Sequence, residues 1–230
     1  MVRAAYTPQR IVIKIDEAQQ VSGLLQEPRD ARACYVLAHG AGAGMAHPFM
    51  ASVAQGLADR GVATLRYQFP YMERGSKHPD SPPIAHAAVR AAVTEAGRLA
   101  PGLALFAGGK SFGGRMTSQA QEQSPLPGVR GLAFLGFPLH PPGKVSDARG
   151  EHLSAVQIPM LFLQGSRDDF ADMGLLSALV ERLGARAILK VLADADHSFH
   201  VPARLGRKDA EVREEMLAAL AGWIEALVAG

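Results

Sequence analysis

A serine lies between closely spaced glycines in the segment Gly109-Lys-Ser-Phe-Gly113. Residues 103–107, just before it, are all apolar, as expected of a buried strand that ends near the serine. A strand that stops at a serine and turns at once into a helix has the geometry of a nucleophile elbow. Glycine is expected on both sides, because a Cβ would collide where strand and helix nearly touch. The pattern makes Ser111 a candidate nucleophile.

A serine hydroxyl is a poor nucleophile unless a base takes its proton and a carboxylate orients that base. On a parallel sheet, such partners lie in loops at the carboxyl ends of later strands. Asp168 follows the mostly apolar segment 159–164, and His197 follows the mostly apolar segment 187–192, both of which are predicted strands. The chain order Ser111, Asp168, His197 is the order that this architecture uses. These three residues are therefore the predicted catalytic residues.

Other residues in the same two loops could take different roles. Asp168 could cap a helix, a role for which Asp169 and Asp172 are equally suited. The spacing of Asp168 after its strand favours it as the orienting carboxylate. His197 is favoured over His200 because it lies nearer to a strand end. The remaining carboxylates of this loop are expected to be solvated charges: Asp194 and Asp196.

The elements that must position these residues alternate between apolar strands and amphipathic helices. Strands are predicted at 11–15, 21–25, 33–38, 62–66, 103–107, 131–136, 159–164 and 187–192, the first two forming an antiparallel hairpin. Helices are predicted to begin near Pro48, Ser81, Gly113 and Leu175, with a last one over 212–227. The sequence therefore predicts one α/β domain over 1–230, with a mostly parallel sheet of about 7–8 strands covered by helices on both faces. Residues 137–158 lack periodicity, which indicates a loop or a small lid.

These motifs together resemble the α/β-hydrolase superfamily, over nearly the whole chain. Within it the chain is most similar to small, nearly lidless, dienelactone-hydrolase-like serine hydrolases. True dienelactone hydrolases carry cysteine where this chain has Ser111, and haloalkane dehalogenases carry aspartate. The resemblance implies that the loop from His39 to Gly42 is the oxyanion loop. The backbone N–H groups of Phe112 and Ala41, or Gly42 in its place, would then bind the developing oxyanion; His39 is expected to brace the turn.

The resemblance implies a carboxylic-ester hydrolase that acts on small substrates through an acyl-enzyme. A phosphate-binding loop is the second hypothesis, since Gly109-Lys110-Ser111 is how such a loop ends. That motif requires glycine at position 104, where this chain has Ala104 in a strand. The third hypothesis is a catalytically silent interaction module with the same fold.

Several residues expected near the carboxyl edge of the sheet could line a substrate pocket or lie on the surface: Arg66, Tyr71, His140, Arg149 and His152. Lys110 is expected to point into solvent. The histidines outside the proposed site show no ligand spacing, so we predict no metal and no cofactor. Cys34 is the only cysteine, which excludes an internal disulfide, and it is expected to be a small core residue.

Composition points to an ordinary globular protein, with 48% hydrophobic and 20% charged residues among 230. A net charge of +2 and the absence of any run of five basic residues argue against nucleic-acid binding. No apolar run approaches 18 residues, which argues against a membrane protein. The N-terminal segment lacks the apolar core of a signal peptide, so we expect a cytoplasmic protein. Its expected partner is a small-molecule, ester-like substrate. Monomer and homodimer both remain open.

Overall fold

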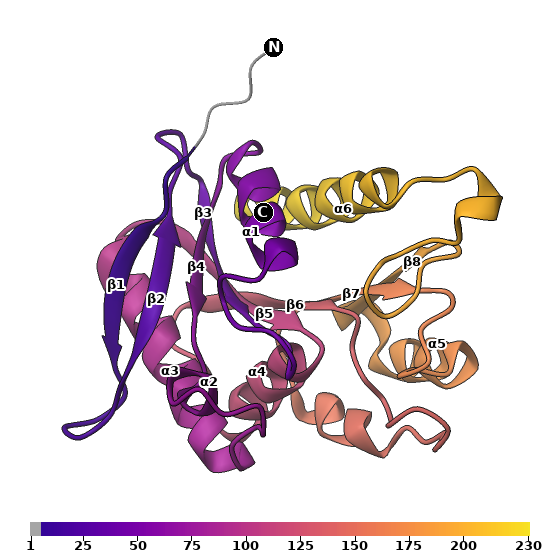
Figure 1. Ribbon diagram of the computed structural model, residues 1–230, viewed down its shortest axis with the longest axis horizontal. Coiled ribbons are helices and arrows are strands. Elements are labelled where there is room, and N and C mark those ends of the chain that lie inside the picture. The colour runs from indigo at the N-terminus through magenta and orange to yellow at the C-terminus, as the bar shows by residue number, and fades with distance from the viewer. Residues whose placement is uncertain (1–5) are drawn as a thin grey trace.

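The computed structural model describes residues 6–230; residues 1–5, part of the segment inspected for a signal peptide, lie outside the described range. Eight strands form one sheet in the order β1-β2-β4-β3-β5-β6-β7-β8 (Figure 1). Only the pairs β1–β2 and β2–β4 are antiparallel. This confirms the predicted mostly parallel sheet with an opening hairpin. The strands are β1 Gln9–Lys14, β2 Gln20–Gln26, β3 Ala33–Ala38, β4 Val62–Tyr67, β5 Ala104–Lys110, β6 Val129–Leu135, β7 Met160–Gly165 and β8 Ala187–Leu192.

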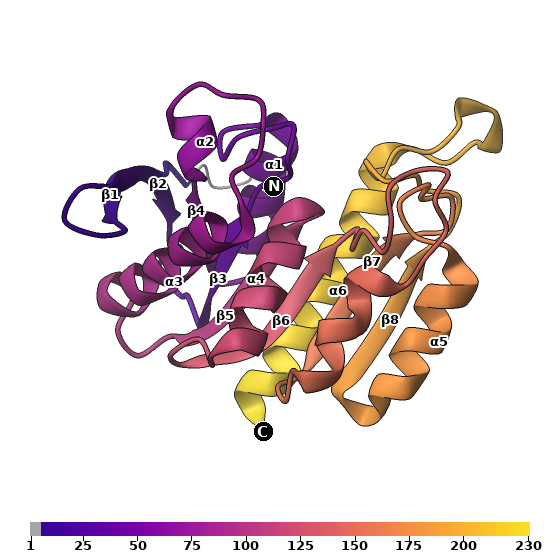
Figure 2. The same ribbon diagram turned by 90° about the horizontal axis from the view of Figure 1, so that it is seen from below.

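Helices cover both faces of this sheet, as predicted: α1 and α6 lie on one face and α3, α4 and α5 on the other (Figures 1 and 2). The helices are α1 Pro48–Ala58, α2 Pro70–Glu73, α3 Pro82–Leu99, α4 Phe112–Gln123, α5 Met173–Leu183 and α6 Asp209–Ala229, with short 3-10 helices at Ala148–Ala155 (η1), Gly184–Arg186 and Ala203–Leu205. Alternate residues of a strand point to opposite faces. In β5, Leu105 therefore packs into the core beneath α3–α5, and Phe106 into the core beneath α1 and α6. Burial on both faces explains why the central strands are continuous apolar runs.

The segment 137–158, expected to be a loop or a small lid, contains η1. This helix lies against α4 and α5. Its His152 Nε2 lies 2.8 Å from Ser118 Oγ on α4, and a Cβ at Gly150 would lie 2.7 Å from the side chain of Leu179 on α5. The segment is thus packed on the α4–α5 side of the molecule.

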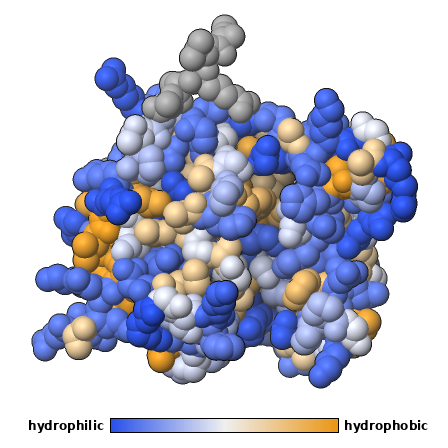
Figure 3. All heavy atoms as spheres, viewed as in Figure 1, coloured by the Kyte–Doolittle hydropathy of each residue, from blue (hydrophilic) through white to orange (hydrophobic). Residues whose placement is uncertain are grey.

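The surface of the molecule is mostly polar on the face shown in Figure 3. Apolar side chains gather on that face along the edge of the sheet formed by β1, where Val12 is 57% exposed. The charged residues Arg10 and Lys14 interrupt this edge, a pattern that disfavours pairing between sheets. Within residues 6–230, no helix combines the length and the apolar character needed to cross a membrane.

Candidate active site

Ser111 lies at the turn between β5 and α4, in a strained backbone conformation. Its φ is +50° and its ψ −114°, which L-residues rarely adopt. A Cβ built at Gly109 would lie 2.2 Å from the carbonyl oxygen of Ala38, and one at Gly113 would lie 2.6 Å from that of His39. Both distances are too short for a side chain. The prediction that glycine is required on both sides of the serine is therefore confirmed.

The three predicted catalytic residues form one hydrogen-bonded line. The Nδ1 of His197 lies 2.7 Å from Asp168 Oδ2, and its Nε2 lies 2.9 Å from Ser111 Oγ. A carboxylate only accepts hydrogen bonds, so Nδ1 carries the proton and Nε2 accepts from the serine hydroxyl. The three residues come from turns that follow β5, β7 and β8, at the carboxyl edge of the sheet. In this arrangement the histidine is oriented to take the proton of the serine.

Residues that the sequence analysis missed hold Asp168 and His197 in place. The carboxylate of Asp168 is fully buried and also accepts from Gln164 Nε2 at 2.6 Å and from the backbone N–H of Phe170 at 2.8 Å. The Phe170 ring stacks on the His197 imidazole, with ring centroids 4.2 Å apart. Gln164 carried a usable signal, because it is the single polar side chain in the buried strand β7. Phe170 carried none.

The alternatives considered for these loops have other environments. Asp169 is exposed, and Asp172 caps α5 by accepting a hydrogen bond from the N–H of Leu175 at 2.9 Å. His200 pairs with Asp209 at 2.6 Å, and its side chain is 66% exposed. Two residues were expected to be solvated charges. Asp194 is exposed as expected; Asp196 instead orders its loop, because its Oδ1 accepts from the N–H groups of Ser198 and His200.

The loop after β3 is braced from behind by His39, as expected. Its Nε2 accepts from the N–H of Phe69 at 3.0 Å, and its Nδ1 donates to the carbonyl of Gly40 at 2.8 Å. Burial lowers the pKa of His39 to about 4, so the imidazole is neutral at neutral pH. The hydroxyl of Tyr71 donates to the carbonyl of Ala41 at 2.9 Å. The loop carbonyls are therefore held on the side of these two rings.

The N–H groups proposed for the oxyanion hole have no hydrogen-bond acceptor within residues 6–230. The N–H of Phe112 is at the first position of α4, where no intrahelical acceptor exists. Among the described residues, neither Ala41 nor Gly42 donates its N–H to a protein acceptor. Gly40 lies beside the serine, since a Cβ built on it would be 3.8 Å from the Ser111 Cβ. Ala41 and Gly42 both remain candidates for the second donor.

Lys110 does not point into solvent, contrary to the expectation. Its ammonium donates to the backbone carbonyl of His197 at 2.6 Å and lies 5.4 Å from the centre of the Phe199 ring. Burial lowers the pKa of Lys110 to about 8, and the nearby carboxylates of Asp168 and Asp196 partly oppose this effect. β5 is extended from Ala104 to Lys110, so no loop is present there to wrap a phosphate. This geometry removes the phosphate-loop hypothesis.

A cavity of about 770 Å³ opens at Ser111. Its walls include residues 40–43, the first turn of α1, and aromatic residues beside the histidine. The rings of Phe49 and Phe199 stack there, with centroids 5.8 Å apart. None of the described residues 137–158 lines this cavity.

None of the five residues offered as possible pocket lining lines this cavity: Arg66, Tyr71, His140, Arg149 and His152. Arg66 belongs to strand β4, is 2% exposed, and donates to the carbonyl of Met45 at 3.2 Å. Tyr71 lies behind the loop after β3, as described above. His140 is buried and its Nε2 accepts from the N–H of Asp172 at 2.9 Å. These polar side chains hold loops from beneath and do not contact the cavity.

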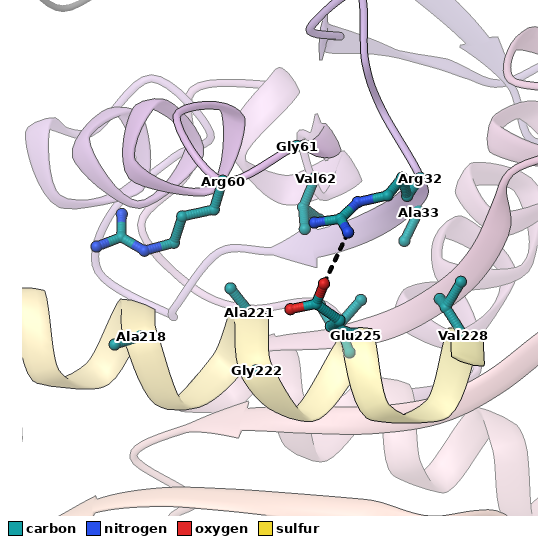
Figure 4. Close-up of a pocket in the computed structure, with 11 residues that line it drawn as sticks. Arg32, Ala33, Arg60, Gly61, Val62, Ala218, Ala221, Gly222, Glu225 and Val228 are labelled. Atoms are coloured by element: carbon teal, nitrogen blue, oxygen red, sulfur yellow. Dashed lines mark hydrogen bonds and ion pairs between the residues drawn. The ribbon is translucent and has the colours of Figure 1, made fainter. Parts of the chain in front are cut away.

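A second cavity, of about 410 Å³, lies at the opposite edge of the sheet, between α6 and the first residues of β3 and β4 (Figure 4). Its two arginines are engaged by carboxylates: Arg32 pairs with Glu225 at 2.7 Å, and Arg60 pairs with Glu214. The other lining residues are small or aliphatic, and no serine, cysteine or histidine is among them. The carboxylate in this lining, Glu225, is engaged in the pair with Arg32, so the cavity has neither a histidine base nor a serine or cysteine nucleophile. Elsewhere within residues 6–230, no group of three or more histidine, cysteine or acidic side chains is placed to hold a metal ion.

The strand order and the serine elbow at the end of β5 define an α/β-hydrolase fold. The chain belongs to the alpha/beta hydrolase domain family, whose model matches residues 31–225. Two solved structures are similar over nearly their whole length. An alpha-beta serine hydrolase homologue from Coxiella burnetii is 18% identical, with 94% of this chain and 99% of that one covered and a TM-score of 0.74. A dienelactone hydrolase from Anabaena variabilis is 19% identical, with 96% and 99% covered and a TM-score of 0.75.

A third structure, a serine hydrolase "without lid" from Xanthomonas campestris, is 18% identical, with 96% of each chain covered and a TM-score of 0.72. At these identities the likeness is one of fold. The family and the fold that the sequence analysis expected are confirmed, and the protein is a member of a hydrolase family.

Proposed function

We propose that this protein is a serine hydrolase that cleaves carboxylic esters of small substrates through an acyl-enzyme. The observation that carries the proposal is the hydrogen-bonded line from Ser111 through His197 to Asp168, next to N–H groups that have no protein acceptor. A family member without catalysis would have no need to keep a serine in a strained conformation with its hydroxyl on a histidine. The support for the proposal is therefore the geometry of Ser111, His197 and Asp168.

In the proposed reaction, each of these residues has a defined role. Ser111 Oγ attacks the ester carbonyl as His197 Nε2 takes its proton, and the buried carboxylate of Asp168 stabilises the imidazolium that forms. The N–H of Phe112, with that of Ala41 or Gly42, binds the oxygen as it gains negative charge. His197 then returns the proton to the leaving alcohol. Water cleaves the acyl-enzyme by the same route in reverse.

The cavity at Ser111 favours esters with an apolar part. Phe49, Phe199 and Phe170 contribute aromatic surface to it, and Met50 adds an aliphatic side chain. An acyl or alcohol group of modest size would bury its apolar surface there, at about 25 cal/mol for each Å² removed from water. We therefore expect esters with a short alkyl or an aryl group to be substrates.

Labelling with a fluorophosphonate followed by peptide mapping tests the proposal. We expect one adduct, on Ser111, and no labelling of Ser111→Ala. The matched control is Ser124→Ala, which changes an exposed serine at the end of the same helix and should label like the wild type. A panel of aryl and alkyl esters then measures turnover. Absence of labelling in the folded protein, with equal and negligible rates for wild type and Ser111→Ala, would refute the proposal and favour a silent binding module.

A further inference from the structure

Lys110 and Ser111 are neighbours in the chain, and both contact His197. The serine hydroxyl binds the imidazole of His197, and the lysine ammonium binds the backbone carbonyl of the same residue. The ammonium is closely packed, since a Cβ at Gly136 would lie 3.0 Å from Nζ. The end of β5 therefore holds both the side chain and the backbone of the predicted base.

The loop that carries His197 contains strained backbone on both sides of it. Asp194 and Phe199 have φ values of +62° and +63°, in the left-handed region that costs energy for residues other than glycine. Hydrogen bonds to Asp196 order the far side of the loop. On the side of the nucleophile, Lys110 supplies a side-chain hydrogen bond to the backbone of His197 itself. A strained loop needs such contacts to keep one conformation.

We propose that Lys110 is a positioning residue: its hydrogen bond to the His197 carbonyl sets the distance and direction of the imidazole relative to Ser111. The inference rests on the proposed function, because positioning matters only if His197 acts as the base. Displacement of about 1 Å in such a site can cost about 100-fold in rate. Lys110 also lines the cavity at Ser111, but this role requires only its contact with the backbone of His197.

The charge of Lys110 adds a signature that can be measured. The groups that face it are the carboxylates of Asp168 and Asp196, the backbone of His197 and the ring of Phe199. Because burial lowers the pKa of Lys110 to about 8, the ammonium loses its proton at moderately alkaline pH. A charged donor makes a hydrogen bond about twice as strong as a neutral one. The contact should therefore weaken above about pH 8.

The test compares kcat and KM for the best ester of the panel between pH 6 and 10, in wild type, Lys110→Met, Lys110→Gln and Lys110→Arg. We expect Lys110→Met to lower kcat about 10- to 100-fold with KM changed less than about threefold. Lys110→Gln keeps a neutral donor and should lose less. Wild type should lose rate above about pH 8, whereas Lys110→Arg, charged throughout this range, should not show this loss. The control is Lys144→Met, at an exposed lysine, which should match wild type.

If folded Lys110→Met has the kcat of the wild type, the inference is overturned. It is also overturned if kcat falls equally in the methionine and glutamine variants and the pH profile of each variant matches that of the wild type. If Lys110→Met does not fold, the glutamine and arginine variants carry the same comparison. Hydrogen exchange of 193–200 gives a readout that does not need activity. Faster exchange there in Lys110→Met supports the contact, and unchanged exchange overturns it. Failure of the proposed function is recognised separately, as absence of fluorophosphonate labelling in wild type.

Discussion

Replacing Lys110 by methionine should change how the stability of the protein depends on pH. Burial lowers the pKa of Lys110 from 10.5 to about 8 in the folded chain, whereas an unfolded lysine keeps its ordinary value. Between these two pH values the unfolded state holds a proton that the folded state has released. The free energy of unfolding therefore rises with pH across this window, and is flat below and above it. The methionine variant lacks this contribution.

The magnitude follows from the pKa difference. At about 1.4 kcal/mol for each pH unit, a fall from 10.5 to about 8 corresponds to roughly 3 kcal/mol as an upper limit. Below pH 8 the same amount is the cost of burying the ammonium, which methionine does not incur. We therefore expect Lys110→Met to be at least as stable as wild type at pH 7, and wild type to gain up to about 3 kcal/mol relative to it by pH 10.5.

Urea denaturation at pH 7, 8, 9, 10 and 10.5 measures this difference. Groups common to both proteins contribute equally, so the difference between the two curves isolates Lys110. The exposed Lys144→Met should give a difference that stays constant with pH. A constant difference for Lys110→Met as well would refute the reasoning, because it would mean that the folded protein does not disfavour the ammonium. If the wild type instead loses stability relative to Lys110→Met as the pH rises, the predicted sign of the pH dependence is wrong.

Three further predictions concern the elbow, the base and the oxyanion loop. Asp168→Asn should lower kcat by about 10³–10⁴ with little change in KM in steady-state assays, because an amide can no longer stabilise the imidazolium. Gly113→Ala should lower the free energy of unfolding in urea by about 1–3 kcal/mol, since its Cβ would lie 2.6 Å from a carbonyl oxygen. Gly42→Ala, with nothing within 4 Å of its Cβ, should show no such loss. Tyr71→Phe removes the hydroxyl that donates to the Ala41 carbonyl and should slow fluorophosphonate labelling about 10-fold. This is less than the roughly 10²–10³-fold loss of rate caused by removing an oxyanion donor itself, because the N–H groups remain present. An unchanged labelling rate would contradict this prediction.

The strands could be predicted because most of them are buried on both faces. Burial on both faces leaves a continuous apolar run, and the run 33–38 matches β3 to the residue. The elbow could be predicted for a similar reason. Its glycines are required by contacts within a few residues of the turn and with the adjacent strand, so the constraint leaves a short local pattern. Helix α2 was missed because four residues are too few to give a periodic signal.

The pocket residues could not be predicted, because membership of a wall depends on the strand order and on the direction of each side chain. Arg66 was expected at the carboxyl edge of the sheet, as the last residue of a strand, but β4 extends to Tyr67 and the arginine is buried against the carbonyl of Met45. Phe49 and Phe199 meet across the cavity from positions 150 residues apart, and neither lies in a motif. Nothing local in the sequence records such a pair.

The direction of the Lys110 side chain also depends on a contact between residues that are far apart in the sequence, and this contact leaves even less trace in the sequence. Its acceptor is a backbone carbonyl 87 positions away, and a carbonyl is present at every residue whatever its side chain. Patterns of side chains can therefore indicate that Ser111, Asp168 and His197 meet, because each needs a particular chemical type. They cannot indicate a partner that every residue possesses. For this reason sequence motifs identify the class of reaction more readily than they identify the contacts that position the catalytic residues. Ser111 and Lys110 are adjacent in the chain and illustrate the difference: the role of Ser111 could be predicted from a motif, whereas the contact of Lys110 could not.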